Sequence, residues 1–329
     1  LLMEPFVFFG GKGGVGKTTV SSSYALKCAR DGHDTLVVST DPAHSVGDVF
    51  DQSFGDDATP VDGVENLWAM QIDPDDEVTR HLNELRQQLS EQVSTAMVSE
   101  INRQLEMAHG TPGAYEAALF DRFVEVMRNA EPYDRVVFDT SPTGSTLRLL
   151  GLPELLEDWI DRLMQKRKVS IDLFEKAAVG NNEPRRVMEG DPVLAQLQDR
   201  KSFFEFAGET LRSDAAFFLV FNPDELSLNE TARAIDDLEA SDLSVRGLIA
   251  NKLTPAPDDD ETGRGARYLR DRIETESKRL TRVREEFGPE LVATIETRTA
   301  EVKGDLLAAV ADEIQIDTTV DPPSEVEHQ

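Results

Sequence analysis

Short apolar runs alternate along this chain with longer stretches in which apolar residues recur at helical spacing. Seven of the runs predict buried strands, at residues 6–9, 35–39, 67–72, 135–138, 216–221, 245–250 and 291–295. Most are separated by helical patterns, and residues 226–240 and 266–286 predict charged surface helices. Parallel strands need long crossovers, so the alternation predicts an α/β fold with a mostly parallel sheet covered by helices on both faces.

Two intervals between the predicted strands are too long for simple crossovers. In residues 75–130, apolar side chains recur at helical spacing from Val78 to Leu105 and predict a long amphipathic helix. Residues 153–213 hold a second helical pattern. We therefore expect a core of residues 3–74, 131–152 and 214–316, and a helical subdomain built from the inserts 75–130 and 153–213. Residues 317–329 should form an acidic, flexible tail.

The negative charge of the chain argues against nucleic acids and anionic membranes as binding partners. Its 329 residues include 63 Asp and Glu against 34 Lys and Arg, which gives a formal net charge of −29. Phosphate backbones and anionic membranes would repel such a protein, so nucleic acid is not an expected partner. Arginine outnumbers lysine, and together with the acid excess this resembles proteins of salt-accumulating halophiles. We expect the fold to require salt, because salt screens the self-repulsion.

The chain contains a single cysteine, Cys28. It therefore cannot form a disulfide within one chain or a zinc site built from several cysteines. No apolar run approaches the length of a membrane span, and the start of the chain has no leader pattern. These observations lead us to expect a cytoplasmic protein.

A glycine-rich segment lies between the first predicted strand and a helical pattern. It fits the phosphate-loop pattern G-x-x-x-x-G-K-[ST] with Gly11, Lys12, Gly13, Gly14, Val15, Gly16, Lys17 and Thr18. In such loops backbone N–H groups and the helix N-terminus face the phosphates. Lys17 should neutralise the β- and γ-phosphates, and the Thr18 hydroxyl should ligate Mg²⁺. We expect ATP and Mg²⁺ to bind at these eight residues and Thr19.

Lys12 adds a second lysine early in this loop. It makes the segment a deviant Walker A motif, a form in which this lysine commonly reaches phosphate in the opposite subunit. There it would stabilise charge on the transferred phosphoryl group, as an arginine finger does. The alternative is a solvated loop lysine. The first interpretation predicts a nucleotide-dependent homodimer that hydrolyses ATP across its two-fold interface.

Two aspartates follow predicted strands, at the sheet edge where ligands bind in such folds. Asp41 comes after residues 36–39 and could position the attacking water, or it could only cap a turn. Asp139 follows residues 135–138 and could hold Mg²⁺ through water, although an aspartate at a strand end is also common before a turn. With the phosphate loop upstream, we predict Asp41, Lys12 and Lys17 as catalytic residues, and Thr18 and Asp139 as the Mg²⁺ site.

In this order, the three motifs resemble those of the arsenical-pump and tail-anchored-protein-targeting ATPase family. The family pattern G-K-G-G-V-G-K-T, D-P-A-H and D-T-A-P-T-G followed by T-L-R is matched here by residues 11–18, 41–44, 139–144 and 146–148. The similarity extends from about residue 6 to residue 309. It implies that Asn251 reads the adenine edge and that residues 299–304 form a second base loop.

This chain departs from the family pattern in three ways. It lacks the C-x-x-C pair with which the eukaryotic targeting branch clamps its dimer through zinc, so we expect no zinc site. Ser45 stands where asparagine is usual, and Ser145 stands where histidine is usual. The proline usual in the second base loop is missing as well.

Three function classes stay open on the sequence alone. Arsenite-pump members join two such halves and bind metalloid through several cysteine thiolates, which Cys28 alone does not supply. Partition-type positioning ATPases usually need a basic surface or a terminal amphipathic helix, and the acidic tail provides neither. The targeting branch resembles this chain best, and it binds hydrophobic transmembrane segments of client proteins and a membrane receptor.

In the targeting branch, two helical subdomains form an apolar groove for a client's membrane helix. Here the corresponding insert is residues 153–213, and the lining residues would be Leu156, Trp159, Ile160, Leu163, Met164, Leu173, Phe174, Phe203, Phe204 and Phe206. The alternative is that these side chains pack the subdomain's own core.

Overall fold

The computed structural model describes residues 3–40, 46–73, 75–80, 114–139, 160–166, 168–169 and 192–319. Its strands are β1 (Phe6–Gly10), β2 (Thr35–Ser39), β3 (Thr59–Pro60), β4 (Leu67–Gln71), β5 (Arg135–Asp139), β6 (Ala215–Phe221), β7 (Val245–Leu253) and β8 (Leu291–Glu296). Its labelled helices are α1 (Lys17–Arg30), α2 (Val46–Phe50), α5 (Ala114–Arg128), α9 (Pro192–Ser213), α10 (Glu225–Glu239), α11 (Arg264–Glu286) and α12 (Asp305–Glu313).

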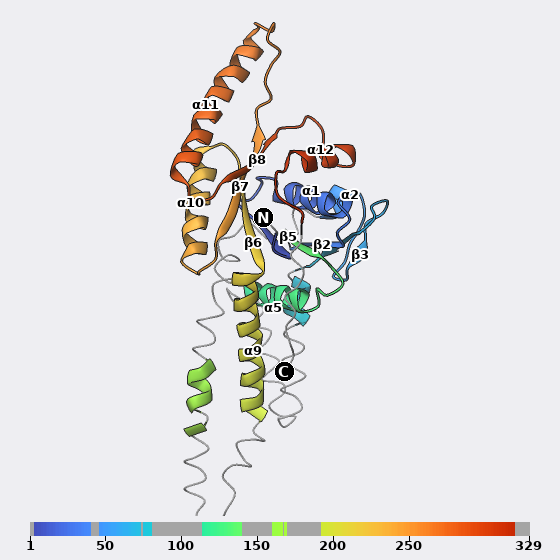
Figure 1. Ribbon diagram of the computed structural model, residues 1–329, viewed down its shortest axis with the longest axis vertical. Helices are drawn as coiled ribbons and strands as arrows, with labels where there is room; N and C mark the ends of the chain where they lie inside the picture. The colour runs from blue at the N-terminus through green and yellow to red at the C-terminus, as the bar shows by residue number, and fades with distance from the viewer. Residues whose placement is uncertain are drawn as a thin grey trace, which may run out of the picture.

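Within the described residues the strands form one sheet in the order β3-β4-β2-β5-β1-β6-β7-β8 (Figure 1). Every pair is parallel except β3 with β4. All seven predicted strands are confirmed, and β7 extends three residues beyond its prediction, to Leu253. The antiparallel edge strand β3 was not predicted, because two residues that include Pro60 carry no alternation pattern.

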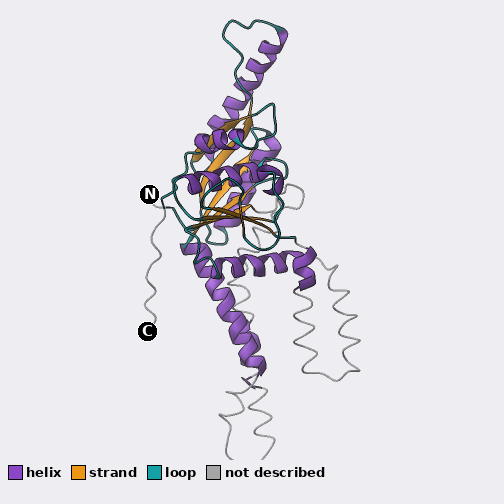
Figure 2. Ribbon diagram, turned by 90° about the vertical axis from the view of Figure 1, so that its right-hand side faces the viewer, coloured by secondary structure: helices purple, strands orange, loops and turns teal. Residues whose placement is uncertain are grey.

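Helices cover both faces of the sheet, as predicted (Figure 2). One face, with Val7 and Phe9 of β1, packs against α1 and α12. The other face, with Phe6 and Phe8, packs against helices that include α5, α10 and α11. This alternation within β1 follows from the two-residue period of a strand. The α/β fold is therefore confirmed.

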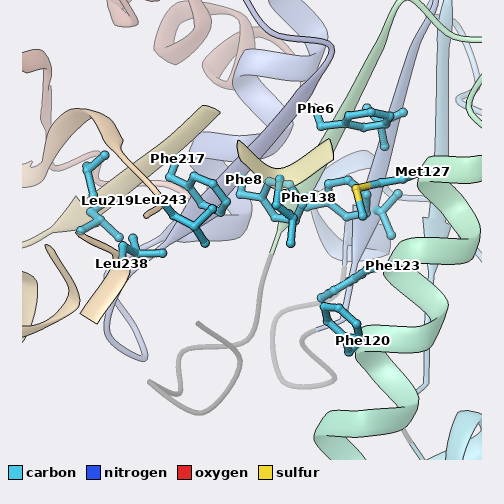
Figure 3. Packing of buried hydrophobic residues seen from close by; sticks show 14 of the residues in the cluster. Phe6, Phe8, Phe120, Phe123, Met127, Phe138, Phe217, Leu219, Leu238 and Leu243 are labelled. Atoms are coloured by element: carbon cyan, nitrogen blue, oxygen red, sulfur yellow. The ribbon is translucent and has the colours of Figure 1, made fainter. Parts of the chain in front are cut away.

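The core on the second face is rich in stacked aromatic rings (Figure 3). The ring of Phe8 lies 4.4 Å from that of Phe138 and 5.1 Å from that of Phe217, centroid to centroid. Phe123 of α5 meets Phe138 edge to face, at 5.2 Å. These contacts join the neighbouring strands β5, β1 and β6 to one another and to α5, and they stabilise the centre of the sheet.

Two described helices, α5 and α9, lie within the predicted inserts. They contact each other through Phe120 and Phe204, with ring centroids 6.1 Å apart, and through the ion pair of Asp121 with Arg200 at 2.7 Å. Of the long helix predicted from residue 75 onward, residues 75–80 are helical and the remainder lies outside the described residues. The division into a core and a helical subdomain stays a prediction.

The two predicted surface helices are confirmed as α10 and α11, and α12 was not predicted. Near the C-terminus, the buried guanidinium of Arg135 donates to the carbonyls of Glu4 and Thr318, and the Met3 N–H donates to Thr319. The first residues of the predicted flexible tail are thus bonded to the start of the chain, and residues 320–329 lie outside the description. In the part of the chain that is described, none of the helices has the length and apolar composition needed to cross a membrane.

Candidate nucleotide-binding site

The glycine-rich segment joins the end of β1 to the start of α1, where the sequence predicts a phosphate loop. Gly11, Gly14 and Gly16 have φ angles of 142°, 79° and 92°, a region that favours glycine. A side chain would also lack room at two of them. A Cβ on Gly11 would lie 2.2 Å from the Val220 carbonyl oxygen, and one on Gly16 would lie 2.4 Å from Nδ2 of Asn251. Glycine is therefore required by the loop's own geometry.

The loop holds a buried cation close to its own backbone. Lys17 is buried, and its Nζ donates to the Lys12 carbonyl at 3.3 Å; the Val15 N–H makes a 3.4 Å contact with the same oxygen. Both distances are long for hydrogen bonds, so the Lys12 carbonyl holds these two donors only weakly. The first turn of α1 contains no acidic residue to oppose an anion.

A pocket of about 490 Å³ opens beside this loop. Five of the predicted nucleotide-binding residues line it, namely Gly14, Gly16, Lys17, Thr18 and Thr19. The predicted base loop contributes Glu301, Val302 and Lys303, so residues nearly 300 positions apart meet at one cavity. Three further residues complete the lining: Asp48, Val49 and Lys252.

The two predicted Mg²⁺ ligands are joined by a hydrogen bond. The Thr18 hydroxyl donates to Oδ2 of Asp139 at 2.6 Å, and the Ser39 hydroxyl donates to the same oxygen at 3.1 Å. Asp139 is buried at the end of β5. Hydroxyl and carboxylate oxygens are the hard donors that Mg²⁺ prefers, so the residues present fit this ion.

Asn251 lies against the phosphate loop. Its buried side chain donates from Nδ2 to the Val15 carbonyl at 2.8 Å, and its Oδ1 accepts the Lys252 N–H at 2.8 Å. Each end of the amide keeps capacity for one more hydrogen bond. The structure thus places Asn251 against the phosphate loop, next to Lys252, which lines the pocket.

Comparison with known proteins gives the family of the chain. The family model described as "Anion-transporting ATPase" matches residues 4–315. The chain belongs to this ATPase family. It is accordingly an ATPase that binds nucleotide.

Three relatives show how far the similarity extends. The ATPase ASNA1 homolog 1 of Paramecium tetraurelia is 33% identical over 260 residues, 77% of this chain and 76% of its own length. The putative arsenical pump-driving ATPase of Halobacterium salinarum is 33% identical over 301 residues, 91% of this chain but 42% of its own length. The ATPase GET3 of Phaeosphaeria nodorum is 32% identical over 250 residues, 75% of this chain and 76% of its own length.

Lys12 of this ATPase lies in a different place from Lys17. Its Nζ lies 3.8 Å from Oε1 of Glu230 on α10, and it is not among the residues that line the pocket. Asp41 and Ser45 lie outside the described residues, as do Ser145 and the rest of the loop after Asp139. The structure therefore joins Lys17, Thr18 and Asp139, and it leaves the role of Asp41 a prediction.

The described members of the predicted client groove are buried or half-buried in this ATPase. Ile160 and Phe204 are buried, and Leu163, Met164, Phe203 and Phe206 are half-buried. The Arg128 guanidinium lies 5.0 Å from the rings of Phe203 and Phe206, and Arg200 covers Phe203 and Phe204 at 4.6 Å. Leu156, Trp159, Leu173 and Phe174 lie outside the described residues. These contacts suit the alternative that the side chains pack a core, and the groove stays a prediction.

Sequence reasoning did not single out Ser39, Asp48 or Lys252. Ser39 is the last residue of β2, and it reaches Asp139 because β2 and β5 pair in register at these two positions. A polar residue at the end of a predicted buried strand marks a candidate at the ligand edge of the sheet, but only the strand order shows that Ser39 meets Asp139. Lys252 follows Asn251 directly, but no local pattern links it to the phosphate loop.

Proposed function

We propose that this ATPase works as a nucleotide-switched homodimer, in which each chain's Lys12 reaches the phosphates bound by its partner. The observation that supports the proposal is that the two lysines of the phosphate loop differ in burial and in position relative to the pocket. Lys17 lies buried at the pocket with Thr18, whose hydroxyl donates to Asp139, whereas Lys12 is partly exposed beside Glu230. A second chain placed over the pocket would bring a cation to the transferred phosphoryl group.

Each residue of the site has a chemical task in hydrolysis. The N–H groups of the loop and Lys17 would bind and orient the β- and γ-phosphates, so the bond to be broken is held for in-line attack. Thr18 and Asp139 would hold Mg²⁺, which when bound neutralises charge on the phosphates. Asp41 would orient the attacking water, and water and ATP yield ADP and phosphate. Asn251 and residues 299–304 would select the adenine base.

We further propose that the nucleotide-switched dimer binds and targets hydrophobic segments of membrane proteins. Its support is the resemblance to the targeting branch and the half-buried apolar side chains Leu163, Met164 and Phe203. The helix that carries Leu163 is tied to α9 by the ion pair of Asp161 with Lys201 at 2.7 Å. In this proposal, ATP-driven closure of the dimer makes these apolar side chains available to a client segment of about 20 apolar residues.

The client proposal is tested by co-purification in molar KCl. A tagged tail-anchored protein should retain this ATPase with a non-hydrolysable ATP analogue and release it with ADP. A matched control lacks the client's membrane segment. Equal retention of both clients in both nucleotides would contradict the proposed output without affecting the hydrolysis mechanism.

Light scattering in molar KCl tests the dimer directly. A single chain has a mass of 36.5 kDa, and saturating non-hydrolysable ATP analogue with Mg²⁺ should shift the measured mass to that of two chains. ADP should reverse part of the shift, because the cross-interface contact with the terminal phosphate is lost. A protein that remains a single chain with the analogue and still turns over ATP at its full rate would refute the proposal.

Arsenite should not stimulate this ATPase, in contrast to the pump alternative. Cys28 is buried in α1, and burial raises the pKa of its thiol to about 11, so the thiolate that binds soft As(III) is scarce at neutral pH. We expect equal turnover with and without arsenite in the wild type and in Cys28→Ala. Stimulation that disappears in Cys28→Ala would instead support the pump branch.

A further inference from the structure

Lys252 holds the phosphate loop from the side of β7. Its Nζ donates to the Gly14 carbonyl at 2.6 Å, beside the bond from Asn251 to the Val15 carbonyl at 2.8 Å. Two adjacent side chains therefore hold two adjacent carbonyls, although the two segments are more than 230 residues apart in the chain. The end of β7 thus forms a two-point clamp on the loop.

The clamp determines where the N–H groups of the loop point. In a trans peptide the carbonyl and the following N–H lie on opposite sides. Holding the carbonyls of Gly14 and Val15 toward β7 therefore turns the N–H groups of Val15 and Gly16 away from it. Outward-turned carbonyls also keep negative dipole ends away from a bound phosphate. A loop held in this way needs little reorganisation to bind an anion.

The backbone of Lys252 indicates that its side chain is needed here. Its φ of 59° lies in the left-handed region, which costs free energy for any residue other than glycine. Strained conformations of this kind persist where the surroundings fix them and often mark functional sites. The bond from its N–H to Oδ1 of Asn251 fixes this one. Glycine would fit the backbone better but would have no ammonium group to offer.

The base of the clamp is itself rigid. Just after β7, Thr254 donates from its N–H to Oε2 of Glu276 at 2.9 Å and from its hydroxyl to Oε1 at 2.7 Å. Glu276 is buried on α11, and Arg272 pairs with it at 3.0 Å. The strand end that carries Lys252 is therefore anchored to α11, independently of the phosphate loop.

We propose that Lys252 is a positioning residue for triphosphate binding: from β7 it holds the Gly14 carbonyl outward and so keeps the loop's N–H groups turned to the phosphates. Lys252 also lines the nucleotide pocket, so its ammonium adds positive charge at the rim. The inference rests on the proposed phosphate site, but it does not depend on dimer formation or on a client.

The test compares Lys252→Gly with the wild type in molar KCl. Glycine relieves the left-handed backbone and removes the tether, so the thermal midpoint should stay the same or rise. The dissociation constants of ATP and of inorganic triphosphate should both increase about tenfold, the value of one charge-assisted hydrogen bond. KM should rise accordingly, while kcat at saturating ATP changes far less. Lys252→Arg should recover most of the affinity, because it restores a cationic donor.

Lys278→Ala is the matched control, because it removes an exposed lysine of α11 that pairs with Glu274. It should leave both dissociation constants unchanged. Unchanged triphosphate affinity in Lys252→Gly, with or without a fall in the thermal midpoint, would overturn the proposal and leave a purely structural role. Failure of the wild type to bind triphosphate would instead count against the proposed phosphate site itself.

Discussion

The Lys12→Ala variant should hydrolyse ATP about a thousandfold more slowly than the wild type, because it lacks the cation that the partner chain supplies in the transition state. Its affinity for ATP should change little. Lys12 does not line its own chain's pocket, and the contacts of Lys17 and Thr18 remain. Single-turnover hydrolysis and equilibrium binding in molar KCl separate the two quantities.

The resting position of Lys12 permits the required movement. The ion pair with Glu230 spans 3.8 Å, and the two side chains are 32% and 39% exposed. Pairs this exposed contribute about 1 kcal/mol or less, and concentrated salt weakens them further. Lys12 can therefore leave Glu230 at little cost. Glu230→Gln is the matched control, since it breaks the same pair but keeps Lys12, and we expect its turnover to be close to wild type.

Mixing Lys12→Ala with Asp139→Asn shows whether Lys12 acts on the partner's site or on its own. Each variant alone should hydrolyse ATP poorly, the first without the lysine and the second without the proposed Mg²⁺ ligand. A Lys12→Ala chain keeps an intact pocket, and an Asp139→Asn chain keeps Lys12. In a mixed dimer one pocket therefore receives a lysine from across the interface. Random pairing of equal amounts should recover about a quarter of wild-type turnover if the two sites act independently. Lack of any recovery, or Lys12→Ala activity near wild type, would contradict the cross-interface role.

Local patterns were sufficient to predict the sheet. Central strands of a parallel sheet are buried on both faces, so they are near-continuous apolar runs such as residues 216–221, which the structure shows as β6. The phosphate loop was predicted for the same reason, since glycines, lysine and threonine are adjacent in the chain. β3 was missed because it depends on pairing with β4 and has no periodicity of its own.

The rest of the site depends on strand order, which no local pattern encodes. Ser39 contacts Asp139 only because β2 pairs with β5, and Lys252 reaches Gly14 only because the end of β7 lies beside the loop. Both contacts join segments at least 100 residues apart. Family resemblance supplied Asn251 because its position is part of a shared pattern. A residue that acts through geometry alone, such as Lys252, requires the structure.

Gly11→Ala should destabilise the fold by about 3–5 kcal/mol, the largest effect on stability expected for a single methyl group in this loop. A Cβ on Gly11 would lie 2.2 Å from the Val220 carbonyl oxygen, and the φ of 142° is itself unfavourable for alanine. Neither chain segment can move away easily, because β1 and β6 pair up to Gly10 and Leu219, directly before these residues. A loop displaced by this clash would also lose its phosphate geometry, so ATP binding should weaken.

Gly14→Ala is the matched control for the steric part of this effect. Gly14 has a φ of 79°, but among the described residues beyond its chain neighbours no heavy atom lies within 4 Å of a Cβ built there. Alanine at this position should cost only the left-handed penalty of about 1–2 kcal/mol. Denaturant unfolding of both variants in molar KCl, with the midpoint and slope fitted together, measures the difference. If Gly11→Ala were no less stable than Gly14→Ala, neither the close approach of the loop to β6 nor the backbone angle of Gly11 would constrain the protein in solution.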